Sequence, residues 1–150
     1  MPIALLTILV IIMDQWSKHY IQDNMVIGMS IPIIPDIFHL TYILNAGAAF
    51  GILENQRYLL IVVAAAMIGA VAFFYRQLAL QPLLLRLGVG LLAGGAIGNG
   101  IDRINTGQVI DFFDFRIWPI FNVADVAIVT GVGCIIYTLI FIPETKDETN

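Results

Sequence analysis

Four apolar segments, each close to the length of a membrane-crossing helix, constrain this chain more than any other feature. They run over about residues 2–21, 58–75, 82–101 and 122–142. A helix needs roughly 20 residues to cross about 30 Å of hydrocarbon. Only 12% of the 150 residues are charged, whereas soluble domains average about 25%. The mean hydropathy is +0.90. The sequence therefore predicts an integral membrane protein with a single domain over residues 1–150.

The expected topology places both chain ends on the same side of the membrane, because four crossings are even in number. The loop between the second and third segments carries Arg76 and Arg86 without an acid, and the positive-inside rule assigns such a loop to the cytoplasm. We therefore expect cytoplasmic termini and outer loops over residues 22–57 and 102–121. No basic residue precedes the first apolar run and no small-x-small site follows it, so we interpret it as an uncleaved helix.

The two outer loops are rich in β-branched and aromatic residues broken by Pro and Gly. The stretches are residues 25–52 and 107–117, and their composition favours short antiparallel strands over a helix. The expected fold is a mainly α membrane protein with four transmembrane helices and a small antiparallel β-sheet on the outer, periplasmic face. Large aromatic residues are expected to anchor it at the membrane interface: Trp16, Trp118, Phe112, Phe113 and Phe115.

Most of the polar residues of interest gather between the last two apolar segments, from Gly94 to Asp125. Ionisable groups at a membrane boundary are costly to desolvate, so they indicate a functional site. Two of them, Asp114 and Arg116, are expected on the solvated surface of the loop. The rest are candidates for chemistry.

The usual nucleophiles and metal ligands are poorly arranged for catalysis. Ser17 and Lys18 are adjacent in a helix, so their side chains point about 100° apart and do not form a dyad. His19 and His39 lack any HExxH or CxxC partner and are expected at loop surfaces. The single cysteine, Cys134, lies inside an apolar run. We therefore expect no metal site, and the absence of a basic patch argues against nucleic acid as a partner.

Carboxylates remain as the candidates for catalysis. The chain between Asp111 and Asp125 is long enough to fold back and bring the two together. Two carboxylates about 3 Å apart share a proton, which leaves one as a base and the other as an acid. Such a pair can activate water against a peptide carbonyl and protonate the leaving amine. The spacing alone is equally compatible with two helix caps or two ion pairs.

Other polar residues have partners at helical spacing. Asp14 and Lys18 are four residues apart, and Asn122 and Asp125 are three apart, so each pair shares a helix face. These spacings favour one connected polar network at the outer ends of the helices.

Two other classes of function remain open on the residues alone. A small transporter or proton-relay protein would carry intramembrane acids through the depth of the bilayer, whereas segment 58–75 contains no charge. A structural or assembly subunit would use the same polar network only to fix helix registry. Isosteric Asp to Asn changes would then affect folding rather than turnover.

Five blocks of the sequence resemble those of the bacterial lipoprotein signal peptidases, the type II signal peptidases. They occur in order between the apolar segments: DQWSK at 14–18, NAGAAFG at 45–51, GGAIGNGIDR at 94–103, GQVIDF at 107–112 and FNVAD at 121–125. The resemblance extends over nearly the whole length of the chain.

The resemblance implies an aspartyl endopeptidase of the bacterial inner membrane with four transmembrane helices and its active site near the periplasmic face. Such an enzyme removes the signal peptide of a diacylglyceryl-modified prolipoprotein, cutting on the N-terminal side of the lipidated cysteine. It implies that Asp111 and Asp125 are the catalytic pair and that no cofactor is needed. We also expect membrane lipids as partners and a monomer. The supporting residues implied by the matching blocks are Asp14, Lys18, Asn45, Asn99, Asp102, Arg103 and Asn122.

Overall fold

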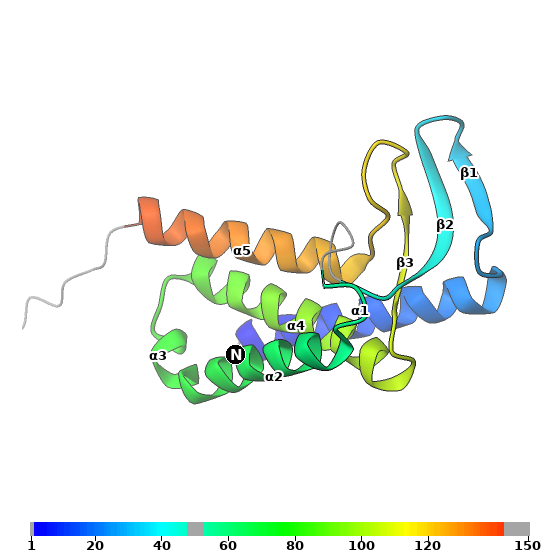
Figure 1. Ribbon diagram of the computed structural model, residues 1–150. Helices are drawn as coiled ribbons and strands as arrows, with labels where there is room; N and C mark the ends of the chain where they lie inside the picture. The colour runs from blue at the N-terminus through cyan, green and yellow to red at the C-terminus, as the bar shows by residue number, and fades with distance from the viewer. Residues whose placement is uncertain (1, 48–52, 143–150) are drawn as a thin grey trace, which may run out of the picture.

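The computed structural model describes residues 2–47 and 53–142, and shows a helical bundle with a small sheet at one end (Figure 1). The fold is mainly helical, as expected. The helices are α1 (Pro2–Asn24), α2 (Arg57–Phe73), α3 (Tyr75–Ala79), α4 (Leu83–Asn105) and α5 (Val123–Phe141), and the strands are β1 (Ser30–Ile34), β2 (Phe38–Asn45) and β3 (Val109–Asp114).

The three strands form an antiparallel sheet in the order β1-β2-β3. They lie side by side across the end of the bundle, whereas the start of α1 and the end of α5 lie at the opposite end (Figure 1). The register of β2 against β3 shifts between Leu40 and Ile43, and beyond this irregularity Ile43 pairs with Asp111. The expectation of a small antiparallel sheet from residues in both loops is therefore confirmed.

The sheet is joined to the bundle through a core at the end of α1. Buried side chains from α1, β2 and β3 meet there, and they include Ile21, Tyr42, Ile110 and Phe112. Phe112 is 2% exposed, so the expectation that it anchors the protein at the membrane interface is wrong. Phe113, next in sequence, is partly buried against the same core, and the centroids of the two rings are 4.5 Å apart.

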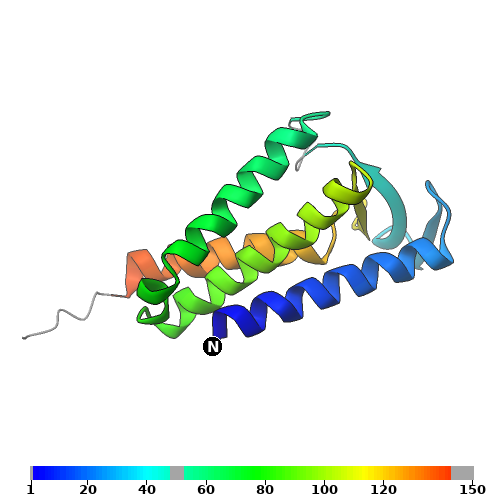
Figure 2. The same ribbon diagram turned by 90° about the horizontal axis from the view of Figure 1, so that it is seen from below.

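Helix α4 is packed between α1 and α5 (Figure 2). Glycines on two of its faces allow the neighbouring backbones to approach. A Cβ on Gly95 would collide with the carbonyl oxygen of Ala124, and one on Gly98 would lie 2.5 Å from Oδ2 of Asp14. Small residues at these positions let helices pack closely where lipid supplies no hydrophobic drive. They also bring the polar ends of α1 and α5 against α4.

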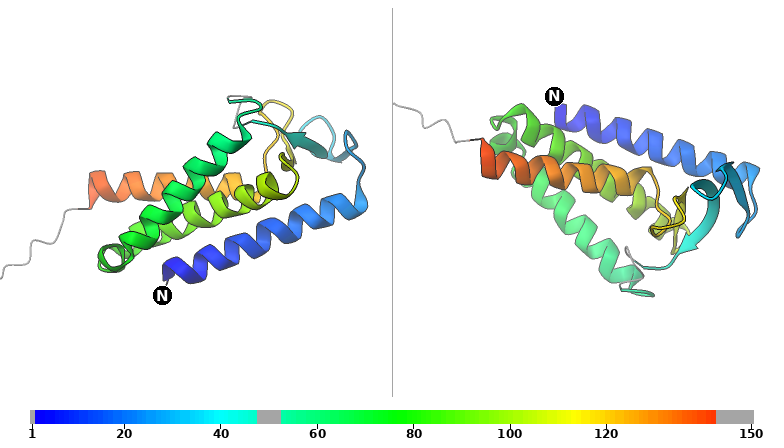
Figure 3. Two further views of the ribbon diagram at one scale, coloured as in Figure 1. Left: turned by 60° about the horizontal axis from the view of Figure 1, so that its bottom comes forward. Right: turned by 90° about the horizontal axis from the view of Figure 1, so that it is seen from above.

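Helix α2 is held far more loosely than the other long helices. None of its residues is buried. It approaches α4 near α3 and diverges from it toward the sheet end (Figures 2 and 3). Its outer end is tied to the bundle by Arg57, which donates to the carbonyl oxygen of Ile104 at 2.8 Å.

Two helices of the described chain, α4 and α5, are long and apolar enough to cross a membrane. Helix α2 is apolar but shorter, at 17 residues, and α1 is not among the helices that meet both criteria.

Candidate active site

Asp111 lies in the middle of β3, directly behind the ends of α4 and α5. Its side chain is buried, with 1% of the residue exposed. Its Oδ1 accepts a hydrogen bond from Nδ2 of Asn122 at 2.7 Å, and its Oδ2 accepts one from Nδ2 of Asn45 at 2.9 Å. Neutral amides therefore contact both oxygens, and neither bond comes from a cation.

Asp125 lies in the first turn of α5, where it forms a capping box with Asn122. The side-chain oxygen of Asn122 accepts from the backbone N–H of Asp125 at 2.9 Å, and Oδ2 of Asp125 accepts from the backbone N–H of Asn122 at 3.2 Å. This reciprocal arrangement satisfies two backbone donors at the start of the helix. The other oxygen, Oδ1, accepts from Nδ2 of Asn99 at 2.8 Å. The spacing of Asn122 and Asp125 predicts that they share a helix face, and in the structure they do so through this capping box.

Asn122 connects the two carboxylates and has no exposed surface. Its amide nitrogen donates to Asp111, to the side-chain oxygen of Asn99 at 3.1 Å and to the carbonyl oxygen of Ile110 at 3.2 Å. One residue therefore binds Asp111 through its side chain and Asp125 through both its side chain and its backbone. The fold brings the two aspartates into one hydrogen-bonded group.

A second buried group lies on the α1 side, where Lys18 contacts two carboxylates. Its Nζ is 2.8 Å from Oδ2 of Asp14 and 2.8 Å from Oδ2 of Asp102, and it donates to Oδ1 of Asn99 at 3.0 Å. Lys18 is 1% exposed and Asp14 is completely buried. The helical pair predicted from the spacing of Asp14 and Lys18 is thus extended by a partner from α4.

This lysine group holds the elements that carry the two aspartates. Oδ1 of Asp14 accepts from the backbone N–H of Ala124 in the first turn of α5, at 3.0 Å. Oδ2 of Asp102 accepts from the backbone N–H of Ile110 in β3, at 3.3 Å. Each carboxylate bound to Lys18 therefore also binds the chain next to Asp125 or Asp111.

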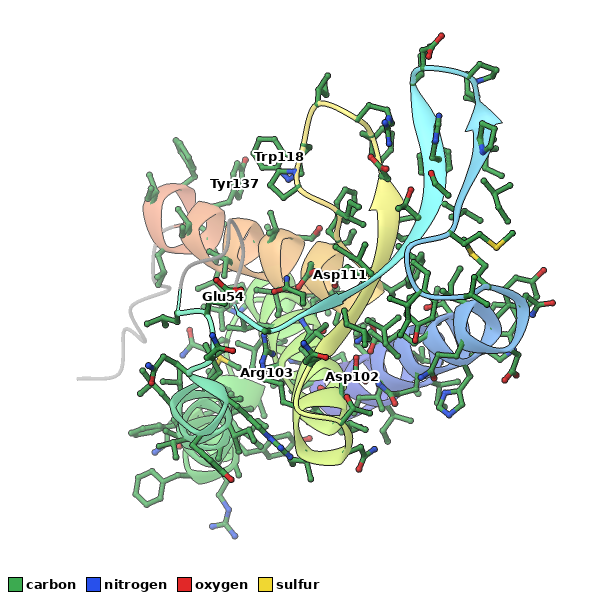
Figure 4. The ribbon with its side chains drawn as sticks, turned by 45° about the vertical axis from the view of Figure 1, so that its right-hand side comes forward. Glu54, Asp102, Arg103, Asp111, Trp118 and Tyr137 are labelled. Atoms are coloured by element: carbon green, nitrogen blue, oxygen red, sulfur yellow. The ribbon has the colours of Figure 1, made fainter. Side chains whose placement is uncertain are left out.

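Arg103 lies on the opposite side of α4 from Asp102 (Figure 4). Its Nη2 donates to the carbonyl oxygen of Gly47 at 2.7 Å and its Nη1 to that of Asn99 at 3.4 Å. Arg103 thereby ties the start of the loop after β2 to α4. The sequence block that begins at Asn45 continues into residues 48–51, which lie outside the described residues.

A groove of about 1190 Å³ runs from this polar end along the bundle, between α2, α4 and α5. Asn45, Asn99, Arg103 and Asp125 line its polar end, together with Glu54. Further along, its walls are apolar and include Leu60, Val63, Met67, Leu92, Ala96 and Ile128. Asp111 is not among the lining residues and lies behind Asn45. The groove is therefore suited to an extended or helical apolar chain with one polar segment beside Asp125.

Two acids of β3, Asp111 and Asp114, have opposite electrostatic character. Burial raises the pKa of Asp111 from an ordinary value of 3.8 to about 7; the charge of Asp125 also raises it, and the bonds from Asn45 and Asn122 oppose the rise. At Asp114 burial acts in the same direction but is outweighed by hydrogen bonds from Thr41 and Arg116, so its pKa is lowered. Asp111 is thus the acid of the strand that holds a proton near neutral pH.

Some polar residues lie elsewhere than the sequence indicates. Asp114 is 3% exposed rather than on the solvated surface, and it pairs with Nη1 of Arg116 at 2.8 Å. His39 lies in β2 and His19 in α1 rather than in loops. Gln15 was not singled out, yet its Nε2 donates to Oδ1 of Asp102 at 3.0 Å and to Oδ2 of Asp14 at 3.2 Å. The signal for Gln15 was its position inside the DQWSK block, since it follows Asp14 directly.

Comparisons with known proteins agree on one family. Residues 6–141 match the model of a family described as signal peptidase (SPase) II. A lipoprotein signal peptidase of Moorella thermoacetica is 46% identical over 140 residues, which is 93% of this chain and 93% of that protein. One from Halothermothrix orenii is 44% identical over 137 residues, 91% of this chain and 94% of the relative. One from Clostridioides difficile is 45% identical over 140 residues, 91% of this chain and 94% of the relative.

The fold agrees with the same conclusion. A solved bacterial membrane enzyme superposes with a TM-score of 0.87 at 36% identity, covering 97% of this chain and 92% of that one. Sequence and structure are thus matched over nearly the whole chain, with each relative also covered almost completely. On this evidence the chain belongs to the signal peptidase II family.

Proposed function

We propose that this protein is an aspartyl endopeptidase that removes signal peptides from diacylglyceryl-modified prolipoproteins, with Asp111 and Asp125 as its catalytic pair. The observation that carries the proposal is the hydrogen-bonded group in which Asn122 binds both carboxylates at the polar end of an apolar groove. Membership of the signal peptidase II family supplies the substrate class.

The two carboxylates are assigned different roles by their surroundings. Asp125 lines the groove and accepts donors at both oxygens in the first turn of α5, where the helix dipole also favours negative charge. It is the base that takes a proton from the attacking water. Asp111 is buried and has a pKa of about 7, so it is the acid that gives its proton to the scissile carbonyl oxygen.

The reaction then balances without a cofactor. Water oxygen bonds to the carbonyl carbon, one water proton passes to Asp125, and the proton of Asp111 passes to the carbonyl oxygen. Collapse of the resulting diol breaks the C–N bond, the proton on Asp125 goes to the leaving amine of the cysteine, and a diol proton returns to Asp111. The incoming carbonyl takes the place beside Asp111 that the amide of Asn45 now holds.

The groove and the bundle fit a substrate that stays partly in lipid. We place four helices, α1, α2, α4 and α5, across the bacterial inner membrane, with the sheet and the dyad near the periplasmic face and both termini in the cytoplasm. The position of the sheet at one end of the bundle, opposite the start of α1 and the end of α5, supports this arrangement. The signal helix lies along the apolar walls contributed by α2 and α5, and its diacylglyceryl chains remain among the membrane lipids. The protein is assigned as a monomer.

This topology can be tested with single cysteines in a Cys134→Ala background. Ser30→Cys, in β1, is expected to react with a membrane-impermeant maleimide in intact spheroplasts, whereas Gln81→Cys, between α3 and α4, is expected to react only after lysis. The opposite pattern would invert the assignment.

Cleavage of a purified diacylglyceryl-modified prolipoprotein in detergent tests the function. Asp111→Asn and Asp125→Asn are each expected to reduce turnover by roughly 10²- to 10⁴-fold, as the loss of a general acid or base does. Asp114→Asn is the matched control, because it removes a buried carboxylate from the same strand, and it is expected to cleave at nearly the wild-type rate. Melting temperatures are measured for every variant.

Near wild-type turnover by a folded Asp111→Asn or Asp125→Asn protein would contradict the aspartate mechanism. Absence of cleavage by the wild-type protein itself would contradict the peptidase assignment.

A further inference from the structure

Three asparagines contact the catalytic pair, and all three point their amide nitrogen, not their oxygen, at a carboxylate. The amide nitrogens of Asn45 and Asn122 donate to Asp111, and that of Asn99 donates to Asp125. An asparagine amide can turn over by 180°, which would present an oxygen instead of a nitrogen to the carboxylate. Something must therefore fix the direction of each amide.

The oxygen of each amide is held by a group that can only donate. Oδ1 of Asn45 accepts from the backbone N–H of Gly47 at 2.9 Å, and Oδ1 of Asn122 accepts from the backbone N–H of Asp125 at 2.9 Å. Oδ1 of Asn99 accepts from Nζ of Lys18 at 3.0 Å and also from Nδ2 of Asn122 at 3.1 Å. Neither a backbone N–H nor an ammonium group can accept a hydrogen bond, so each amide nitrogen has to face its aspartate.

Lys18 differs from the other two donors because it is a side chain, and because its own position is fixed. Its ammonium group has three donors, and the partners within reach are Asp14, Asp102 and Asn99. With 1% of the residue exposed, Lys18 has no solvent to turn toward. Its contact with Asn99 is consequently as constrained as a backbone contact.

We propose that Lys18 is a positioning residue for the peptidase reaction: by holding the oxygen of Asn99 it directs the amide nitrogen of Asn99 at Asp125 and stabilises Asp125 in the charged form that acts as base. The inference rests on the proposed function. It gives the buried lysine a role in turnover, apart from its role in holding α1 and α4 together.

The charged groups around Asp125 set the expected direction of a pH effect. Arg103 on α4 and Asp111 on β3 interact with its charge, Glu54 lines the same groove, and Lys18 on α1 reaches it through Asn99. Asp14 and Asp102 contact Lys18. Removal of Lys18 takes away a positive charge and leaves the oxygen of Asn99 held by the neutral amide of Asn122 alone, so the amide nitrogen of Asn99 is directed less firmly at Asp125. Both changes disfavour the charged carboxylate, so the acid limb of the kcat/KM profile moves to higher pH.

The experiment is a double-mutant cycle between Lys18 and Asn99, measured as cleavage of a diacylglyceryl-modified prolipoprotein from pH 4 to 9. Because Lys18→Met alone leaves two buried acids without a cation, the cycle is built on Asp14→Asn, which keeps an oxygen for the N–H of Ala124. The four proteins are this background alone, with Lys18→Met, with Asn99→Ala, and with both. Thr7→Val is the control, since it removes another α1 to α4 hydrogen bond, from Oγ1 of Thr7 to the carbonyl oxygen of Gly90, away from the dyad.

Lys18→Met and Asn99→Ala are each expected to lower kcat by about 10- to 100-fold, the effect of one hydrogen bond to a charged group, with KM changed less than about threefold. Each is expected to move the acid limb up by about one pH unit. The double variant is expected to be no slower than Asn99→Ala, because Lys18 acts through Asn99. Thr7→Val is expected to leave the pH profile in place.

The proposal would be overturned if the loss of kcat in the double variant equalled the product of the losses in the two single variants. An unmoved acid limb in either single variant would also overturn it. Asn99→Ala decides the matter even if the Lys18→Met proteins do not fold, because it leaves Lys18 paired with Asp102: an unmoved acid limb in that variant refutes the inference. Failure of the wild-type protein to cleave would instead refute the proposed function.

Discussion

Two pairs of aspartates lie in the polar cluster, one buried and one that reaches the groove through Asp125, and they differ in what lies between them. Asp14 and Asp102 are bridged by the ammonium group of Lys18. Asp111 and Asp125 are bridged by the amides of Asn122 and flanked by those of Asn45 and Asn99. An ammonium group supplies a full positive charge in contact with its carboxylates and an amide does not, so the second pair lacks the direct compensation that Lys18 gives the first.

Within this single polar cluster, one pair of aspartates therefore has a structural role and the other a chemical role. The compensated pair binds backbone donors of α5 and β3 and fixes the positions of these elements. No ammonium group contacts the pair formed by Asp111 and Asp125. This is the condition under which one carboxyl can stay an acid while the other is a base at the same pH. The predictions that follow either exchange the two characters or measure how far apart they are.

The largest effect is expected from Lys18→Met, which turns the compensated pair into an uncompensated one. Breaking a buried ion pair on one side costs about 3–5 kcal/mol, so the melting temperature at pH 8 should fall steeply. The loss should be smaller at pH 5, because the acids left without a cation can then take up protons. Thermal unfolding in detergent at both pH values measures this, and an equal loss at the two would mean that the pair is not charged in the folded protein.

The reverse exchange, Asn45→Lys, places a cation beside Asp111 and is expected to affect turnover more than stability. Asn45 is half-buried at the end of β2, so a long side chain can be accommodated with its stem along the groove. The cation lowers the pKa of Asp111, removes the proton of the acid at neutral pH and should reduce kcat/KM at pH 7 about 100-fold. Asn45→Gln is the control for size. A pH–rate profile should recover activity toward lower pH, and a uniform loss at every pH would contradict this explanation.

The smallest effect concerns the dependence of stability on pH. The pKa of Asp111 is 3.8 in its ordinary state and about 7 in the fold, so between about pH 4 and 7 the folded chain holds a proton that the unfolded chain has lost. Stability therefore falls as pH rises through this window, by about 2 kcal/mol between pH 5 and 7. Asp111→Asn has no proton to lose and should show a flatter profile of melting temperature. Asp114 has a lowered pKa, so Asp114→Asn should keep the wild-type slope across that window; equal slopes for Asp111→Asn and wild type would show that Asp111 is not the group responsible.

Much of the helical architecture could be predicted from the sequence because apolar runs and their interruptions are local properties. Helix α5 begins next to Asn122 because that residue caps it, and the spacing of Asn122 and Asp125 already indicates a shared face. The apolar run over 58–75 is divided in the structure, where α2 ends at Phe73 and α3 begins at Tyr75. No Pro or Gly lies at that break, so the sequence does not indicate it.

The cross-helix contacts could not be predicted, because sequence spacing specifies partners only within one element. Lys18 was assigned to Asp14 by its position four residues on, yet Asp102 on α4 lies equally close. Phe112 is buried by packing against α1 and β2, and Asp114 by its contacts with Thr41 and Arg116; neither set of contacts can be read from strand alternation. The direction of each asparagine amide depends on a donor elsewhere in the fold. The resemblance to a family indicates which residues matter, and the three-dimensional arrangement gives each one a contact.

The capping box of α5 has a consequence for the way this protein fails on heating. Asp125 is the proposed base, and its side chain also caps the first turn of α5. Helix ends open more readily than helix interiors, so a population with a frayed first turn arises while the bundle remains intact. In that population the carboxylate of Asp125 no longer makes its hydrogen bonds. The molecule is then folded by any spectroscopic criterion but does not cleave substrate. Loss of cleavage should therefore precede the melting transition, and the interval between the two temperatures reports the local stability of a single helical turn.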